Sequence, residues 1–188
     1  MKGLRPHDRG ISEVFGVMLI LTITLIVACI VTVFAGGFSL DTKTDAISAN
    51  IVASDLYMNS STRCAYIQFE HISGDPVDLD SIVVTLGLRS SAKTTTRITN
   101  ADHPTGVNET GSKLTHYLKS YGGDKSKITV GDRFVLYADG IDDGIYWQSK
   151  GADEKFSAPM NDYITYRIVD TRSNRPISSG KIPVSGTG

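Results

Sequence analysis

The chain has 188 residues, which is enough for one modest domain beside a hydrophobic segment. Its formal net charge is −1 at pH 7. Residues 1–40 carry three cations and two carboxylates, a net of +1, which leaves −2 for residues 41–188. This nearly neutral remainder excludes an electrostatic nucleic-acid binder, which would show a basic stripe.

An uncharged run from Val14 to Leu40 dominates the N-terminal part. As a helix, the 25 residues from Val14 to Phe38 would be about 38 Å long, more than the roughly 30 Å of a bilayer core. The run is apolar on all sides and lacks the polar face of a surface helix. We therefore expect the helix to lie in lipid or in a bundle of similar helices.

The charges around this run predict its orientation. Lys2, Arg5 and Arg9 precede it, and no cation follows it until Lys43. The positive-inside rule then places the leader in the cytoplasm and residues 41–188 outside.

Three kinds of N-terminal processing are open. Val33-Phe34-Ala35 offers a signal-peptidase site, but the apolar run before it exceeds the 7–15 residues typical of a signal peptide. Ile26-Val27-Ala28-Cys29 offers a lipobox, but apolar sequence continues beyond the cysteine. The third route cuts before the helix, where the charged leader ends in Arg9-Gly10.

The stretch DRGISEVFGV at residues 8–17, with the apolar run up to residue 38, resembles the class III signal of archaeal type IV pilins. In that family a prepilin peptidase cuts after the glycine and leaves the helix on the mature protein. The resemblance implies a cut after Gly10, Arg9 as the basic residue before it, and Ile11 as the new N-terminus.

Glu13 departs from the family pattern. Type IV pilins generally carry a glutamate at the fifth mature position, whereas Glu13 would be the third. A displacement of two residues turns a helix by about 200°, so Glu13 is only a candidate for pairing with a neighbouring N-terminus. The alternative is that Glu13 compensates the positive end of the helix dipole.

The remaining chain predicts a β-rich head. Gly36-Gly37 suits a helix end, residues 39–45 form a linker, and Ile47 to Ser54 alternate as a first strand. Further strands are expected at 63–72, 80–89, 93–99 (an edge strand, polar on both faces), 133–138, 145–148, 162–169 and 177–184. Residues 100–127 look like a loop-rich insertion. The fold class is therefore α+β, one helix followed by an antiparallel, Ig-like sandwich or small barrel over residues 46–188.

No catalytic or metal constellation is evident in the head. Asp75 and Asp132 follow glycines at turns, where aspartate serves backbone hydrogen bonds. Asp139, Asp142 and Asp143 do not fit a calcium-loop spacing, and the four histidines are scattered. We expect no enzyme activity, cofactor or metal.

Two cysteines and two sequons complete the inventory. Cys29 lies in the helix and Cys64 in the polar part, so both are interpreted as small buried hydrophobes. Asn59 and Asn108 begin N-x-[ST] triplets and are candidate glycosylation sites, Asn108 the better one because of its loop-rich surroundings.

The resemblance implies a structural pilus subunit. The precursor would sit in the membrane, and its helix Ile11–Phe38 would polymerise with copies of itself after cleavage. An assembly ATPase and a membrane platform would extract it from lipid into an extracellular filament used for adhesion. The alternative is a single-pass, membrane-anchored binding protein, or a minor pilin that does not polymerise.

Overall fold

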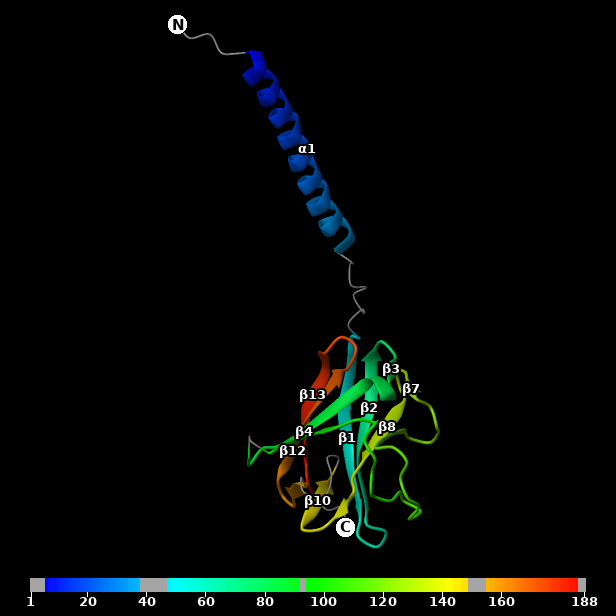
Figure 1. The fold of residues 1–188 in the computed structure, drawn as a ribbon. Coiled ribbons are helices and arrows are strands. Elements are labelled where there is room, and N and C mark those ends of the chain that lie inside the picture. The colour runs from blue at the N-terminus through cyan, green and yellow to red at the C-terminus, as the bar shows by residue number, and fades with distance from the viewer. Residues whose placement is uncertain (1–5, 38–46, 92–93, 149–154, 186–188) are drawn as a thin grey trace. The chain divides into compact units, whose positions relative to one another are not determined.

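The computed structural model describes residues 6–37, 47–91, 94–148 and 155–185. The chain divides into two units, Met1–Thr44 and Asp45–Gly188. The first contains helix α1, Pro6–Gly37 (Figure 1). This helix begins five residues before Ile11 and is described as far as Gly37. Because the residues after Gly37 lie outside the described part, the glycine pair as a helix end stays a prediction. Phe38 and the predicted linker lie outside the described residues.

The second unit contains two four-stranded sheets. Sheet 1 has the order β1-β2-β8-β6, formed by Ala49–Asn59, Cys64–Gly74, Arg133–Tyr137 and Leu118–Ser120. Sheet 2 has the order β13-β12-β4-β5, formed by Arg175–Pro183, Tyr163–Asp170, Ile82–Leu88 and Thr95–Ile98. Every described pairing is antiparallel, so the predicted α+β class is confirmed.

Smaller elements complete the head. A three-stranded sheet has the order β11-β10-β9, formed by Phe156–Pro159, Gly144–Trp147 and Gly140–Ile141. The pair β3 and β7 consists of Val77–Asp78 and Lys127–Ile128, and a 3₁₀ turn, η1, spans Leu79–Ser81. The expectation of about eight strands was too low, because strands of two to four residues are too short to show a period of two.

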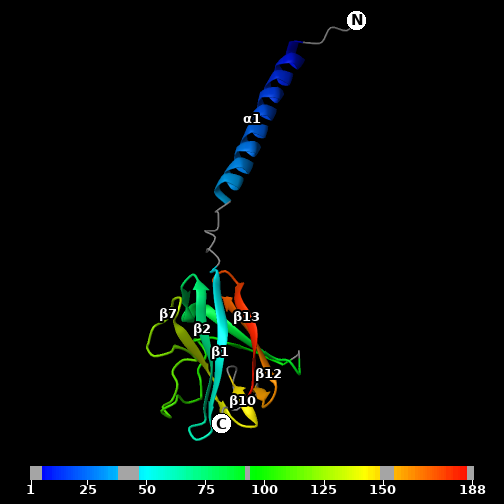
Figure 2. The ribbon, with the colours of Figure 1, turned by 180° about the vertical axis from the view of Figure 1, so that it is seen from behind.

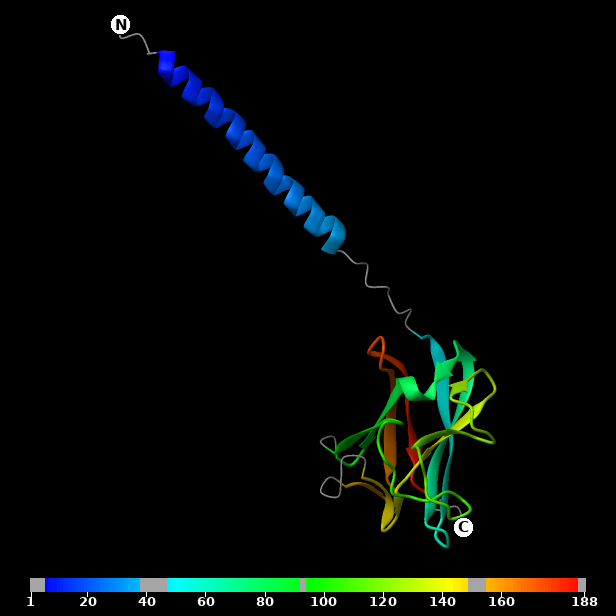
Figure 3. The same ribbon diagram turned by 45° about the vertical axis from the view of Figure 1, so that its right-hand side comes forward.

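The two main sheets enclose the core. Phe69 of β2 meets Tyr166 of β12 edge to face at 5.1 Å and stacks on Phe134 of β8 at 5.1 Å. Alternate residues along β12, Ile164, Tyr166 and Ile168, are buried, as a strand with one face on the core requires. Burial of each such side chain stabilises the fold by about 1.5–3 kcal/mol. Figure 3 shows the two layers, with β12 and β13 in orange and red and β1 and β2 in cyan and green.

Strand β1 is longer than predicted, and a bulge at Ser54, where the predicted strand ended, explains why. The register to β2 shifts between Asn50 and Ile51 and again between Ala53 and Asp55. The second shift changes the phase of the strand, so that Ile51 and Leu56, five residues apart, are both buried. A sequence pattern with period two breaks at such a bulge.

Strand β5 corrects another expectation. It is the predicted edge strand of sheet 2, but it is not polar on both faces, because Thr96 and Ile98 are buried. Residues 100–127 contain few strands, as expected. Their apolar side chains Leu114, Tyr117 and Leu118 are all buried. These three side chains attach the long connection to the head.

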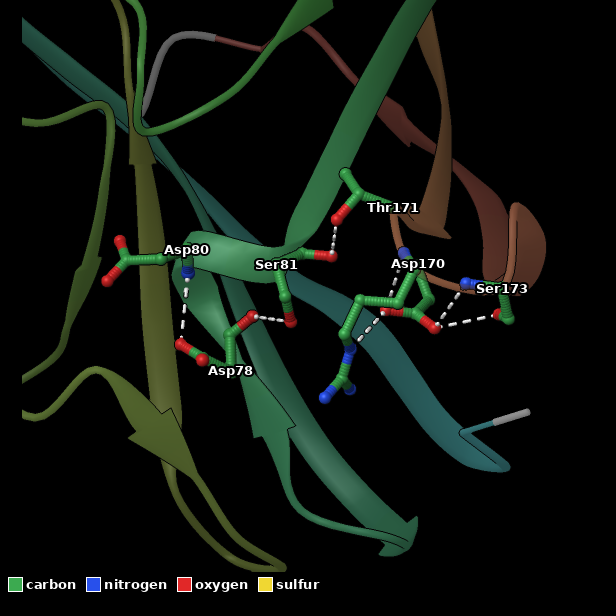
Figure 4. A network of polar contacts seen from close by, with 7 residues as sticks. Asp78, Asp80, Ser81, Asp170, Thr171 and Ser173 are labelled. Carbon is green, nitrogen blue, oxygen red and sulfur yellow. Dashed lines mark hydrogen bonds and ion pairs between the residues drawn. The ribbon is translucent and has the colours of Figure 1, made fainter. Parts of the chain in front are cut away.

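Tight turns fix the ends of the strands. Gly74 has φ +103°, and a Cβ there would lie 2.1 Å from the carbonyl oxygen of Ser48, so only glycine fits this turn. At the other sheet, the carbonyl oxygen of Ser81 accepts hydrogen bonds from the backbone N–H (2.8 Å) and the hydroxyl (2.9 Å) of Thr171 (Figure 4). The start of β4 is thereby joined to the β12–β13 turn.

Candidate functional site: the leader junction and the apolar helix

The predicted cleavage residues lie within one continuous helix. Arg9, Gly10, Ile11 and Glu13 all belong to the first turns of α1. The peptide bond after Gly10 is therefore helical in the uncut chain. Glycine lowers helix stability by about 1 kcal/mol relative to alanine, so Gly10 weakens α1 at the predicted cut.

The apolar part of α1 is long enough to cross a membrane. Among the described residues, Val14–Thr32 is a 19-residue span of mean hydropathy 3.0, and none of it is buried within the chain. Large apolar side chains along the span are exposed, among them Phe15 at 69% and Leu25 at 67%. A helix so apolar all round needs lipid or other helices as its surroundings.

The polar groups of this span are already satisfied. The hydroxyl of Thr22 donates to the carbonyl oxygen of Met18 at 2.7 Å, and that of Thr24 to Leu21 at 2.9 Å. The hydroxyl of Thr32 lies 2.9 Å from the carbonyl oxygens of both Ala28 and Cys29. Unpaired hydroxyls would be costly in an apolar environment, so these bonds suit the helix for lipid and for a bundle alike.

Two small residues on α1 are open in the single chain. A Cβ at Gly16 would meet nothing within 4 Å, and Cys29 is exposed. The expectation that Cys29 is buried therefore does not hold within one chain, whereas Cys64 in the head is fully buried. Small side chains on a membrane helix let another backbone approach closely.

Residues 9–51 match the family model described as archaeal type IV pilin, N-terminal. The chain carries an archaeal type IV pilin N-terminal domain. The domain begins at Arg9, contains the whole apolar span and ends in β1. Residues 9–51 are therefore pilin-like, and the family that they match is one of structural proteins. The domain and the apolar helix fit a membrane-anchored precursor.

Two other proteins are similar to the chain. An uncharacterised protein of Archaeoglobus fulgidus is 28% identical over 129 residues, covering 68% of this chain and 86% of that protein. The archaellum periplasmic stator protein FlaG from Sulfolobus acidocaldarius covers 71% of this chain and 99% of its own, with 14% identity and a TM-score of 0.39. Neither likeness is strong enough to assign a function to the head.

The aspartates singled out in the head hold turns, as predicted for the Gly-Asp pairs. Oδ2 of Asp75 accepts from the backbone N–H of Ser48 at 3.0 Å. Oδ2 of Asp132 accepts from the backbone N–H and the hydroxyl of Thr129 at 2.9 and 2.8 Å. These hydrogen bonds lower the pKa of Asp132 below its ordinary value.

Asp139 organises a buried polar network that the sequence did not reveal. It is 6% exposed, and its carboxylate accepts from the hydroxyl of Tyr117 and the backbone N–H of Gln148, both at 2.7 Å. The backbone N–H and hydroxyl of Thr105 donate to its other oxygen. Burial raises the pKa of Tyr117, and its hydrogen bond to Asp139 raises that pKa further. This network anchors the long connection to β8.

The remaining candidates do not form a metal or catalytic centre within the described residues. Asp142 pairs with Lys155, on the exposed surface. No three His, Cys, Asp or Glu side chains of the described part come close enough to hold a metal ion. His71 is fully buried, and neither of its ring nitrogens has a hydrogen-bond partner. The other described histidines, His103 and His116, are exposed.

The two sequons differ in how their amides are used. At Asn59, Nδ2 donates to the hydroxyl of Tyr57 at 3.2 Å, while Oδ1 accepts from the backbone of Ser61 and Thr62. At Asn108, Oδ1 accepts from the hydroxyl of Thr110 at 2.8 Å, and Nδ2 has no hydrogen-bond partner among the described residues. Both polar atoms of the Asn59 amide are therefore hydrogen-bonded within its hairpin, whereas at Asn108 the bonded atom is Oδ1.

Sequence reasoning missed one surface feature. The outer face of sheet 2 presents hydroxyl and cationic side chains from several strands over a shallow groove of about 560 Å³. Its signal was present in the sequence as alternating polar residues, such as Thr165 with Arg167 and Ser179 with Lys181. Only the strand order brings these pairs onto one surface.

Proposed function

We propose that the chain is a structural subunit of an archaeal type IV pilus. A prepilin peptidase cuts it after Gly10, and the helix from Ile11 onward polymerises with copies of itself. The observation that carries the proposal is the combination of two features in α1. An Arg9-Gly10-Ile11 junction inside a pilin domain stands directly before a 19-residue apolar span of which nothing is buried.

The charges of the leader fit a precursor held in the membrane. Three cations in residues 1–10 keep the N-terminus in the cytoplasm and place the head outside. Cleavage after Gly10 removes all three. The remaining helix, residues 11–37, is about 40 Å long, enough for a bilayer or for a filament core. The cut therefore frees the helix from the charges that hold it in place.

Exchange of lipid for neighbouring helices requires little change in solvation. Lipid tails and Leu, Ile and Val side chains are similarly apolar, so association rests on packing and on close approach at small residues such as Gly16. Extraction from the membrane needs work, which an assembly ATPase acting through a membrane platform supplies. Head domains on the outside of the filament then make the contacts that give adhesion.

Glu13 acts at the new N-terminus. After the cut it is the third residue of the helix and lies in its first turn. A carboxylate there offsets the positive end of the helix dipole by about 0.3–1 kcal/mol. It also places a negative charge within reach of the free amine of a neighbouring Ile11 in a bundle.

A second candidate is a single-pass anchored binding protein or a minor pilin that does not polymerise. The head favours it in one respect, because it has a core of its own, formed entirely by residues of the second unit. Such a head does not need a filament to fold. The state of the helix in cells distinguishes the two candidates.

The test is the mature N-terminus together with filament formation. Mass spectrometry of the protein in an archaeal host should give a chain beginning at Ile11, and sheared surface filaments should contain it. Gly10→Leu should block processing and abolish filaments. Gly16→Leu is the matched control for processing alone, because a side chain at Gly16 meets no atom of the chain. It should still be cut before Ile11, and its filaments are not compared, since Gly16 is a proposed point of close helix approach.

Each outcome has a clear reading. A chain starting at Gly36, or a lipidated Cys29, contradicts the proposed cut. Normal filaments from the Gly10→Leu chain also contradict it. Correct cleavage at Ile11 with no filament containing the chain supports the minor pilin.

A further inference from the structure

The outer face of sheet 2 carries an ordered array of polar side chains. Thr165 of β12 stands opposite Gly87 of β4 and Lys181 of β13. Two residues along β12, Arg167 stands opposite Thr85 and Ser179. Side chains opposite one another in a sheet point to the same face, and the alternating residues of β12 are buried in the core. These two rows therefore point away from the core.

Gly87 hollows the middle of this face. It lies between Thr165 and Thr95 in its row, and a Cβ there would lie 2.9 Å from Oγ1 of Thr165. The resulting shallow groove of about 560 Å³ is lined by Thr85, Thr95, Thr165, Ser179, Arg167 and Lys181, together with Leu86, Gly87, Tyr166 and Gly180. Figure 2 shows β12 and β13, the strands that form one side of it.

The polar groups of the groove are available to a ligand. Across the described residues, neither the hydroxyls of Thr85, Thr95, Thr165 and Ser179 nor any atom of the Arg167 guanidinium makes a hydrogen bond or ion pair. Nζ of Lys181 lies 5.7 Å from the ring centroid of Tyr163, a contact that leaves its N–H groups open. Hydroxyls in the turns, such as those of Thr129 and Ser173, are in contrast already bonded to carboxylates.

The charge of the face has one sign. In the described strands of sheet 2, the carboxylate is that of Asp170, which is 1% exposed and faces inward. Arg167, Lys181 and Arg97 are exposed. A groove with cations and free hydroxyl groups, and without an exposed carboxylate in its lining, fits an anionic ligand that also offers many hydrogen-bonding groups.

We propose that this groove binds an anionic polysaccharide, a sugar chain bearing carboxylate or sulfate groups. The anionic groups pair with Arg167 and Lys181, and sugar hydroxyls bond to the threonine and serine hydroxyls between them. The inference rests on the proposed function in one respect, that the head is displayed outside the cell where such polymers occur. It gives the adhesive head a ligand class.

Other polymers fit the face less well. Protein interfaces centre on aromatic and apolar side chains, whereas the exposed large hydrophobic residues of the described head, such as Ile72 and Val130, lie elsewhere. Single-stranded nucleic acid is bound on open aromatic rings, but Tyr163 is already contacted by Arg89 at 5.6 Å and by Lys181.

The experiment uses the full-length chain in detergent micelles, before any assembly. Binding is measured to polygalacturonate and dextran sulfate, with neutral dextran and duplex DNA as comparisons. We expect binding to both anionic polysaccharides, weakened by salt, and little to neutral dextran. The double variant Arg167→Glu/Lys181→Glu should weaken it at least tenfold. Thr85→Val/Thr165→Val, which keeps every charge, should weaken it several-fold.

The matched control is Lys113→Glu/Lys127→Glu, which changes net charge equally at two exposed lysines outside the groove. It should bind like the original chain. Equal loss in both double variants, no binding to either polysaccharide, or tighter binding to DNA overturns the proposal. Unfolding followed by the fluorescence of Trp147, the single and fully buried tryptophan, verifies that each variant is folded.

This outcome is separable from that of the pilus proposal. Binding is read on the uncut, unassembled chain, so loss of cleavage or of filaments does not affect it. A chain that is cut at Ile11 and polymerises but does not bind either polysaccharide refutes the groove alone. A chain that binds but is never cut refutes the pilus alone.

Discussion

The hydroxyl of Tyr166 accepts a hydrogen bond of 3.0 Å from the backbone N–H of Ala53, although the two residues lie in different sheets and 113 positions apart. Next to it, the hydroxyl of Ser178 donates to the carbonyl oxygen of Ile51. Strand β1 is thus joined to sheet 2 by side chains rather than by a ladder. Gly180 makes this possible, because a Cβ there would lie 2.5 Å from the Tyr166 hydroxyl.

These contacts of β1 with Tyr166 and Ser178 form a seam between the two sheets. Changes at Tyr166 or at the neighbouring Gly180 should destabilise the head. Tyr166→Phe leaves the Ala53 N–H without its acceptor and should cost about 1–2 kcal/mol. Gly180→Ala forces the ring to move and should cost about 1–3 kcal/mol. Urea unfolding of the full-length chain in detergent, followed by Trp147 fluorescence, measures both. Tyr163→Phe is the control, since its hydroxyl has no hydrogen-bond partner among the described residues. Unchanged midpoints for both test variants would show that the seam contributes nothing.

Asp170 closes the β12–β13 turn and makes the stability of the head depend on pH. Burial alone would raise its pKa, but hydrogen bonds from the hydroxyl (2.7 Å) and backbone N–H (3.1 Å) of Ser173, and from Arg172, outweigh burial (Figure 4). The pKa therefore lies below its ordinary value. A depressed pKa stabilises the fold above the unfolded value of about 3.9, and this contribution is lost as the pH falls through the folded value.

The variant Asp170→Asn should reveal this dependence. At pH 7 it should be less stable by about 1.5–3 kcal/mol, because a charged acceptor is lost. As the pH falls below about 4, the gap to the original chain should close. Urea midpoints at several pH values measure the gap. The control Asp142→Asn, at an exposed ion pair, should leave the urea midpoint close to that of the original chain at every pH. A gap that stays constant down to pH 2 would rule out a titrating Asp170.

Cys64 should be chemically inert in the folded head. It is fully buried, and burial, followed by the negative charge of Glu109, raises its pKa to about 12. At pH 8 only about one thiol in ten thousand is then thiolate, the reactive form. Iodoacetamide followed by peptide mass spectrometry should leave Cys64 unmodified until urea unfolds the head. Ser61→Cys, at an exposed hairpin position, should react at once. Stoichiometric labelling of native Cys64 would contradict the burial.

Asn108 rather than Asn59 should carry a glycan if the filament is glycosylated. The Asn108 amide nitrogen lacks a hydrogen-bond partner among the described residues, while that of Asn59 is bonded to Tyr57. Peptide mapping of protein from an archaeal host should show an added mass on Asn108. Asn108→Gln should remove it, and Asn59→Gln should leave the protein mass otherwise unchanged. A glycan on Asn59 alone would contradict this ranking.

Several parts of the fold could be predicted because they depend on local pattern. The inward set of β12 follows from its strict alternation, and the turn at Gly74 from a residue that tolerates φ +103°. Strand β1 was predicted too short because a bulge at Ser54 breaks its alternation. The short strands β9 and β11 gave no pattern at all. Thr96 was placed on a polar face because its burial depends on a neighbouring layer.

The sequence alone determined the N-terminal part. An uncharged helix with a cationic leader and an Arg9-Gly10-Ile11 junction can be read locally, because length, charge and apolar character act along one segment. The tertiary structure decided the surface of the head. Thr165, Gly87 and Lys181 lie in strands far apart in the chain, and only antiparallel pairing brings them into one row. The hydrogen bond between Tyr166 and Ala53, for which Gly180 leaves room, likewise depends on the packing of the two sheets, which no local pattern encodes.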